Sequence, residues 1–238
     1  MALGEYGPRA AYFAVADGAI IRRFKDETGD PEAKPVTRKD GSIVYERQFK
    51  YIEGFVTKIE IASSTFNGVT TEKAQWKIHI KDGDENYVVT MHYNSAYAKR
   101  FINCAASVTD WSKRIRISPW KMDKTDDKGV IMPGKFWLGV TLYAAPFGKD
   151  NKYAPKYSKD DIPPMVKVRF KGEDRWDDEA QMLFWEKVVT DEIIPKIQAV
   201  SALTTFSASA DPHAEHELAM ETAAVAGAQN ADYDDVPF

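Results

Sequence analysis

Cationic, aromatic and apolar residues alternate in several short stretches of this sequence, and KRIRISPW is the clearest of them. Within Lys113–Trp120, isoleucines occupy positions 115 and 117, and Arg114 and Arg116 alternate with them. A period of two is typical of a β-strand with one buried face, so the arginines, Ser118 and Trp120 would point to solvent. Cations bind phosphates, and aromatic rings stack on unpaired bases of any identity. The stretch therefore predicts a surface that binds single-stranded nucleic acid.

Two further stretches, AQWKIHI (74–80) and KFWLGVTLYAA (135–145), repeat the alternation, and a basic loop with two tyrosines follows at 149–159. We expect the loop either to close over the bound strand or to stay solvated. The predicted nucleic-acid contacts from all these segments are Lys77, His79, Arg114, Arg116, Trp120, Lys121, Lys135, Trp137, Tyr143, Lys152, Tyr153 and Lys156.

The aromatic residues also have a structural interpretation, because most tryptophans of a globular protein help to fill its core. The chain has six tryptophans, of which Trp76, Trp176 and Trp185 are expected to be buried or half-buried. Any single ring of the outward set either stacks on a base or packs in the core.

Turn signals and period-two patterns predict the strands that must position these side chains. Two apolar runs flank the dipeptide Asp17-Gly18, which predicts a two-residue hairpin turn. The stretch Ile43–Ala62 is rich in β-branched and aromatic residues, and Gly54 within it predicts a bulge or bend. Further strands are expected at 74–80, 87–93, 113–120, 135–145 and 165–170, and an exposed loop at 26–41.

Two segments have helical spacing. The first, Asn94–Val108, would be capped by Asn94 or Ser95. The second, 174–200, would begin at Asp174 and would kink or end at Pro195. Its expected apolar stripe is Trp176, Ala180, Leu183, Val188 and Ile194.

A helix between the third and fourth of five antiparallel strands is the element order of an OB-fold. The predicted fold class is therefore mainly β: a five-stranded OB-fold barrel with an additional N-terminal hairpin and a C-terminal helix. Another small β-barrel or a β-sandwich would also fit this order.

The charge is divided unevenly along the chain. All 32 basic residues precede Ser201, whereas seven acidic residues follow it, and the segment 34–170 holds 24 basic and 15 acidic residues. A basic body indicates a polyanionic partner, and the acidic tail would then be a mobile competitor of that partner for the same basic surface. We expect one nucleic-acid-binding domain over 1–200 and a disordered acidic tail over 201–238, because the latter has no hydrophobic periodicity.

Known catalytic and metal-binding patterns are missing from the sequence. It contains neither a P-loop nor a G-x-S-x-G elbow. The segment His213–Glu217 (HAEHE) reverses the zincin spelling and falls in the tail, and Cys104 is the single cysteine. We therefore expect no enzyme activity, no metal site and no cofactor.

No apolar run is long enough to cross a membrane, and the N-terminus does not look like a signal peptide. These features predict a cytoplasmic protein with no membrane partner.

The chain ends in DYDDVPF, Asp232–Phe238. This segment resembles the acidic C-terminal tip of bacterial and bacteriophage single-stranded DNA-binding proteins, which ends in aspartates, an aliphatic residue, proline and phenylalanine. The resemblance implies an OB-fold protein of DNA replication, recombination and repair whose tip docks on partner proteins. The tip residues that it implicates are Asp232, Asp234, Asp235, Val236, Pro237 and Phe238.

The extra hairpin, the long loop and the C-terminal helix depart from the compact bacterial proteins and are similar to the larger bacteriophage-encoded members. The departure leaves assembly into a homo-oligomer and each individual DNA contact open. Two other classes also stay open: an OB-fold RNA-binding protein, and a recombination-associated nuclease, which would need a divalent metal.

Overall fold

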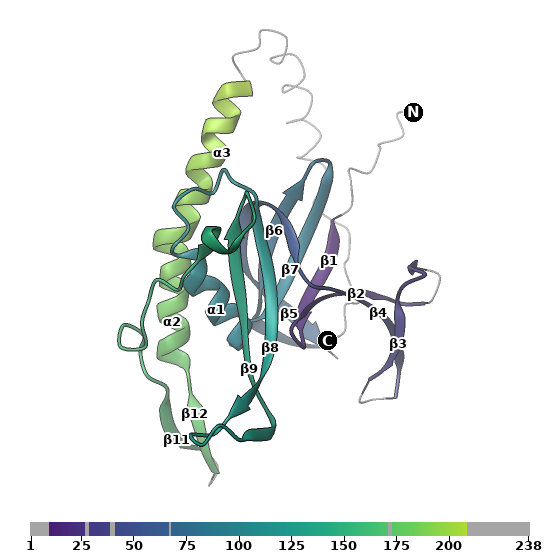
Figure 1. Ribbon diagram of the computed structural model, residues 1–238, viewed down its shortest axis with the longest axis vertical. Helices are drawn as coiled ribbons and strands as arrows, with labels where there is room; N and C mark the ends of the chain where they lie inside the picture. Colours follow the sequence, from purple (N-terminus) through teal and green to yellow (C-terminus); the bar gives the residue numbers. More distant parts are fainter. Residues whose placement is uncertain (1–9, 27–28, 39–40, 67, 171–172, 209–238) are drawn as a thin grey trace.

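Ten strands form one continuous sheet in the computed structural model of the protein (Figure 1), which describes residues 10–26, 29–38, 41–66, 68–170 and 173–208. The strands of the sheet are β1 (Ala11–Ala16), β2 (Ala19–Phe24), β3 (Lys34–Thr37), β4 (Ile43–Phe49), β5 (Ile52–Phe66), β6 (Val69–Asp82), β7 (Glu85–His92), β8 (Ile115–Thr125), β9 (Ile131–Ala144) and β10 (Lys152–Tyr153). Their order across the sheet is β10-β9-β8-β5-β6-β7-β1-β2-β4-β3.

The remaining elements are a separate hairpin and the helices. The hairpin pairs β11 (Val166–Phe170) with β12 (Glu173–Asp177). The helices are α1 (Ala96–Ala105), the 3₁₀ turn η2 (Lys149–Asn151), α2 (Glu179–Val188), the π-helical turn η3 (Val189–Ile193) and α3 (Ile194–Ala208). In Figure 1, α2 and α3 run along one side of the sheet, and β3 and β4 project on the other. No helix in the described part of the chain is long and apolar enough to cross a membrane.

The mainly β class is confirmed, but the sheet is not closed into a barrel. The free edge of β7 pairs with β1 in parallel, and β9 pairs with β8 and the short β10. The tip of the β1–β2 hairpin lies against β8 and helix α1. There the Gly18 amide donates to Tyr97 Oη at 2.7 Å, and Asp17 accepts from Lys121 at 2.8 Å.

The predicted N-terminal hairpin is confirmed. Asp17 and Gly18 both have positive φ, 50° and 77°, as a two-residue turn between twisted strands requires. The segment 26–41 is not only a loop, because β3 lies within it and pairs with β4, but all four residues of β3 are exposed, as expected. Pro35 is tolerated there since β3 is the last strand of the sheet, where a missing amide donor breaks no ladder.

The long strand predicted over 43–62 is two strands that separate at Lys50-Tyr51. The second of them, β5, pairs with a different strand along each part of its length: Ile52–Gly54 pair with β8, and the strand from Phe55 onward pairs with β6. Gly54 stands at this change of partner. A Cβ atom there would lie 2.5 Å from Ile80 Cγ2 and 2.7 Å from the Lys81 carbonyl oxygen, so only glycine allows the two strands to approach.

The core lies between the inner face of the sheet and the helices. The prediction that Trp76, Ile78 and Ile80 point inward is confirmed, since their exposed fractions are 2, 0 and 1 %. Helix α1 begins at the predicted cap, where Ser95 Oγ accepts from the Ala98 amide. Cys104 is buried in the same core.

The C-terminal helical segment departs from the prediction at its start. Helix α2 begins at Glu179 instead of Asp174, because Asp174–Asp177 pair with β11 in a hairpin. Trp176 is consequently 65 % exposed, and Leu183 of the predicted apolar stripe is 52 % exposed. Trp185 is buried, as predicted.

The same helical segment also continues further than predicted. Pro195 does not end it: α3 runs through Ala208, past Ser201, where regular structure was expected to stop. The turn η3 ends at Ile193, two residues before the proline, and its wider π-helical hydrogen-bonding pattern accommodates the lack of an amide donor at Pro195. The rest of the predicted tail lies outside the described residues.

Replacing Gly54 should loosen the junction of β5, β6 and β8. Because the added methyl group meets Ile80 and a backbone carbonyl, we expect Gly54→Ala to lower the free energy of unfolding by about 1–3 kcal/mol. Urea unfolding measures the change. Gly148→Ala is the matched control, since nothing lies within 4 Å of a Cβ atom there. Equal stabilities of the two variants would contradict the proposed close approach.

Candidate nucleic-acid interface

The outward faces of β8 and β9 form a ladder of polar and aromatic side chains. Their register places Arg116 opposite Tyr143, Ser118 opposite Thr141, Trp120 opposite Gly139 and Met122 opposite Trp137. The intervening residues Ile115, Ile117, Val140 and Leu142 are at most 1 % exposed and face the core. We call the eight outward residues the outer ladder. The predicted alternation of β8 is therefore confirmed.

Arg116 stands at one end of the outer ladder in a fixed position. Its Nε and Nη2 atoms both lie 2.8 Å from Glu53 Oε2, and its guanidinium carbon is 4.2 Å from the ring centroids of Tyr51 and Phe147. Stacking and the carboxylate hold the guanidinium plane between two rings. Sequence analysis did not single out Tyr51 and Phe147, because neither belongs to an alternating strand stretch.

Trp120 packs on Gly139 in the middle of the outer ladder. A Cβ atom at Gly139 would lie 2.8 Å from Trp120 Cε2, so the glycine makes room for the indole ring. Trp120 is half-buried and thus combines a packing role with a partly accessible ring.

Trp137, at the far end of the outer ladder, is the more accessible ring. It is 52 % exposed, and Lys124 Nζ lies 4.4 Å from its ring centroid. An exposed indole with a cation beside it offers one surface for a base and one charge for a phosphate. Lys135, two residues earlier on β9, is also exposed.

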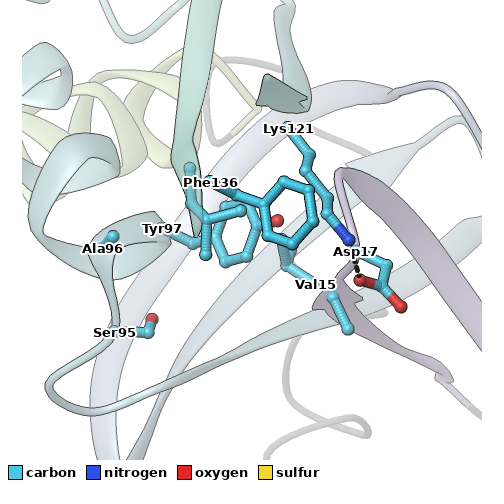
Figure 2. Close-up of a pocket in the computed structure, with 9 residues that line it drawn as sticks. Val15, Asp17, Ser95, Ala96, Tyr97, Lys121 and Phe136 are labelled. Carbon is cyan, nitrogen blue, oxygen red and sulfur yellow. Dashed lines mark hydrogen bonds and ion pairs between the residues drawn. The ribbon is translucent and has the colours of Figure 1, made fainter. Parts of the chain in front are cut away.

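A shallow hollow of about 490 Å³ lies beside Lys121, between the β1–β2 turn, the start of α1 and β9. Figure 2 shows Lys121 reaching Asp17 next to the ring of Phe136, with Tyr97 behind. Lys121 Nζ is 3.9 Å from the Phe136 ring centroid, and the hydrogen bond to Asp17 raises the pKa of Lys121. Lys121 therefore binds the tip of the β1–β2 hairpin and lies on the face of β8 opposite to the outer ladder.

The predicted contacts on β6 are not part of the outer ladder, because β5 lies between β6 and β8. His79 Nε2 lies 2.8 Å from Glu60 Oε1, and Lys77 is partly exposed on the same side of β6. Arg114 also turns toward the β6–β7 end of the sheet, where it binds Asp82 at 2.8 Å. The structure thus groups Arg116, Trp120, Trp137 and Tyr143 on one face and places Lys77 and His79 apart from them. Arg114 stays beside Arg116, because it also contacts the Glu53 carboxylate, at 3.6 Å.

The basic loop 149–159 is docked on the helices. Lys152 pairs with Tyr143 across β9 and β10, which adds a cation beside the outer ladder, and Tyr153 packs against the core. Lys156 and Tyr157 both bind the Glu192 carboxylate of η3, and the Tyr157 amide donates to Asn103 Oδ1. Lys156 is therefore occupied by an ion pair that helps to fix the loop.

Carboxylates accompany many of the predicted cations. Arg114, Arg116, Lys121 and Lys156 each have an ion pair, whereas within the described chain Lys77, Lys135 and Lys152 have none. Partly exposed ion pairs contribute little stability, so a phosphate can replace the carboxylate. The carboxylates fix the positions of these cations and at the same time reduce the positive charge of the interface.

No family model, curated protein or solved structure matches this chain. The described residues also contain no group of three or more His, Cys, Asp or Glu side chains placed to hold a metal ion. The predicted partner-binding tip, Asp232–Phe238, lies outside the described residues.

Acid should weaken the attachment of the loop 149–159 and of α2. Burial opposes ionisation of Glu192 and Glu186, but hydrogen bonds outweigh it and lower the pKa of both carboxyl groups. The donors are Lys156 and Tyr157 for Glu192, and Lys73 and Tyr93 for Glu186. A lowered pKa stabilises the folded state above the unfolded value of about 4.3, and this contribution is lost as pH falls through the folded pKa.

We therefore expect the double variant Glu186→Gln/Glu192→Gln to lose about 1–3 kcal/mol per site at pH 7. Its stability should also fall less steeply than that of the parent below about pH 4.3. Urea unfolding across pH measures both effects. Glu72→Gln, which removes an exposed carboxylate of β6, is the control. A parallel pH dependence of parent and double variant would show that the two carboxylates are not linked to folding.

Proposed function

We propose that this protein binds single-stranded DNA without sequence preference and acts in DNA replication, recombination and repair. The observation that carries the proposal is the outer ladder together with its immediate neighbours, because cations adjoin partly exposed rings at both of its ends. Tyr51, Arg116 and Phe147 stand at one end, and Lys124 and Trp137 at the other.

This arrangement suits unpaired strands better than duplex. Every base has a face that can stack, and each stacked base contributes roughly 1–3 kcal/mol, so two or three rings and several cations are enough for tight binding. A duplex keeps its bases stacked on one another and cannot offer them to Trp137 or Tyr51.

The strand connectivity supports an opened form of the OB-fold. The sequence of strands β5, β6, β7, α1, β8, β9 and the neighbour order β9-β8-β5-β6-β7 are those of an OB barrel without its last pairing, that between the third and fifth strands. We infer that the β1–β2 hairpin replaces this pairing. Its tip lies on β8, where a Cβ atom on Gly18 would be 2.8 Å from Lys121 Cβ.

The proposed recruitment of replication and repair proteins depends on the sequence of the tip. Asp234 and Asp235 would meet a basic rim on the partner, Phe238 an apolar pocket, and the Phe238 carboxylate a cation. Such a peptide linked to a DNA-binding body raises the local concentration of its partner on DNA without a large rigid interface.

Titration of the protein with poly(dT) should quench tryptophan fluorescence. If about 4–6 phosphates are bound, log K should fall against log salt with a slope of about −3 to −4. Binding should be tighter to single strands than to duplex. A salt-independent affinity, or a preference for duplex, would overturn the proposal.

Trp137→Ala should weaken binding to a labelled dT oligonucleotide by roughly 1–3 kcal/mol while the fold stays intact, because it removes a stacking ring. Fluorescence anisotropy measures the affinity. Leu183→Ala is a matched control, since Leu183 is equally exposed but lies on α2.

Competition between DNA and RNA oligonucleotides tests the RNA-binding alternative, and metal-dependent cleavage of labelled DNA tests the nuclease alternative.

Adding one glycine after Phe238 should separate the two roles of the tip. The acidic charges remain, but the carboxylate leaves the residue that bears the ring, so capture of partner proteins should fail. DNA affinity should stay that of the parent, whereas deletion of Asp232–Phe238 should raise it at low salt, where screening is weakest. Pull-down measures partner capture. If the extended and the parent protein capture partners equally, the tip is only a solubilising tail and the docking role is contradicted.

A further inference from the structure

The β11–β12 hairpin lies outside the ten-stranded sheet and is paired only with itself among the described strands. Its register sets Lys167 opposite Trp176, Val168 opposite Arg175 and Arg169 opposite Asp174. An isolated two-stranded hairpin is marginally stable in water. A hairpin that projects in this way is therefore expected to serve a purpose other than building the core.

Apolar side chains on this hairpin are open to solvent. Trp176 is 65 % exposed, more than Trp137 at 52 %, while Trp76, Trp111 and Trp185 are each 2 % exposed. Val166 and Val168, on the opposite face, are also exposed. Trp176 and Trp137 are thus the two openly accessible indole rings of the described chain.

The face that bears Trp176 is cationic. Strand alternation places Lys167, Arg169, Asp174 and Trp176 on one side of the hairpin. Lys167 Nζ lies 2.6 Å from Asp174 Oδ2, but both side chains are more than half exposed, so the pair is easily opened. Arg169 makes no hydrogen bond or ion pair with another described residue. This face thus repeats the chemistry of Trp137 with Lys124.

The hairpin also lies at the same end of the molecule as Trp137 and Lys124. Figure 1 shows β11 and β12 at the lower end of its long axis, the end toward which the β8–β9 hairpin extends beyond the rest of the sheet. Trp137 and Lys124 belong to that extension, since Trp137 pairs with Met122 and both lie beyond Ile115–Ile117, the part of β8 that pairs with β5.

We propose that the β11–β12 hairpin is a second binding element for single-stranded DNA, in which Trp176 stacks on a base and Lys167 and Arg169 contact phosphates. A strand on the outer ladder leaves it at Trp137 and continues onto this hairpin. The inference rests on the proposed function. It favours DNA over a protein partner because the cations and the ring share one face, whereas an apolar docking surface would not need them.

Two substitutions of Trp176 in the full chain separate stacking from apolar contact. Trp176→Leu keeps an apolar side chain and removes the aromatic face, so affinity for a labelled dT oligonucleotide longer than the roughly 16 nucleotides that one OB-fold covers should fall about 5- to 100-fold. Trp176→Phe should retain most of the affinity. Circular dichroism and thermal unfolding verify that the variants stay folded.

The charged residues have their own readout. Lys167→Gln/Arg169→Gln should make the salt slope shallower by about 1.4, from roughly 0.7 for each lost phosphate contact. Lys25→Gln/Lys34→Gln removes two exposed lysines from β3 and the end of β2 and should leave the slope unchanged.

The outcomes distinguish the two proposals. If the parent protein does not bind the oligonucleotide, both fail. If the parent binds and Trp176→Leu binds equally well, the hairpin proposal alone is overturned. It is likewise overturned if Trp176→Leu binds DNA normally but shifts the mass measured by light scattering, because the hairpin would then join two copies of the chain.

Discussion

The change of partner along β5 holds the two parts of the sheet together. Three residues at its start pair with β8, and the rest of the strand pairs with β6, with Gly54 packed against Ile80 at the point of exchange. The strands β8 and β9 have no other ladder connection to β6 and β7 among the described residues. The outer ladder therefore keeps its place relative to the rest of the sheet because a single glycine permits a close crossing. Helix α1 and the C-terminal helices then fill the space that the bent sheet encloses.

The electrostatics of the candidate interface follow from neighbouring carboxylates as much as from the cations. Glu53 and two rings orient Arg116, and Asp17 draws Lys121 toward the hairpin tip. An oriented guanidinium loses less conformational freedom on binding than a free one. The same carboxylates lower the net positive charge, so a ligand gains from geometry and stacking more than from long-range attraction. This balance agrees with a surface that must release its ligand as well as hold it.

Local patterns predicted much of the fold and the inward and outward sides of its central strands. Alternation identified Trp76, Ile78, Ile115 and Ile117 as core, because this pattern depends on neighbours in sequence. Cap preference narrowed the start of α1 to Asn94 or Ser95, and Ser95 is the cap. Long-range pairing was not predictable in this way. Periodicity alone did not indicate that β7 would pair with β1 instead of β9. Trp176 was assigned to a helix from the helical pattern, which the pairing of Asp174–Asp177 with β11 overrides. Ion pairs such as Lys156 with Glu192 join segments far apart in sequence, so charge type alone did not separate docked cations from available ones.

The parallel pairing of β1 with β7 has a consequence for the order of events during synthesis. The β1–β2 hairpin leaves the ribosome before its partners, because β7 and Tyr97, which receive it, follow more than sixty residues later. Until then β1 presents an unpaired edge that could join a strand from another nascent chain. Non-local pairing of this kind also slows folding, because a long loop must close before the contacts form. The β1–β2 hairpin is therefore made before β7 but reaches its place only after it, and in the nascent chain this hairpin is a segment for a chaperone to protect.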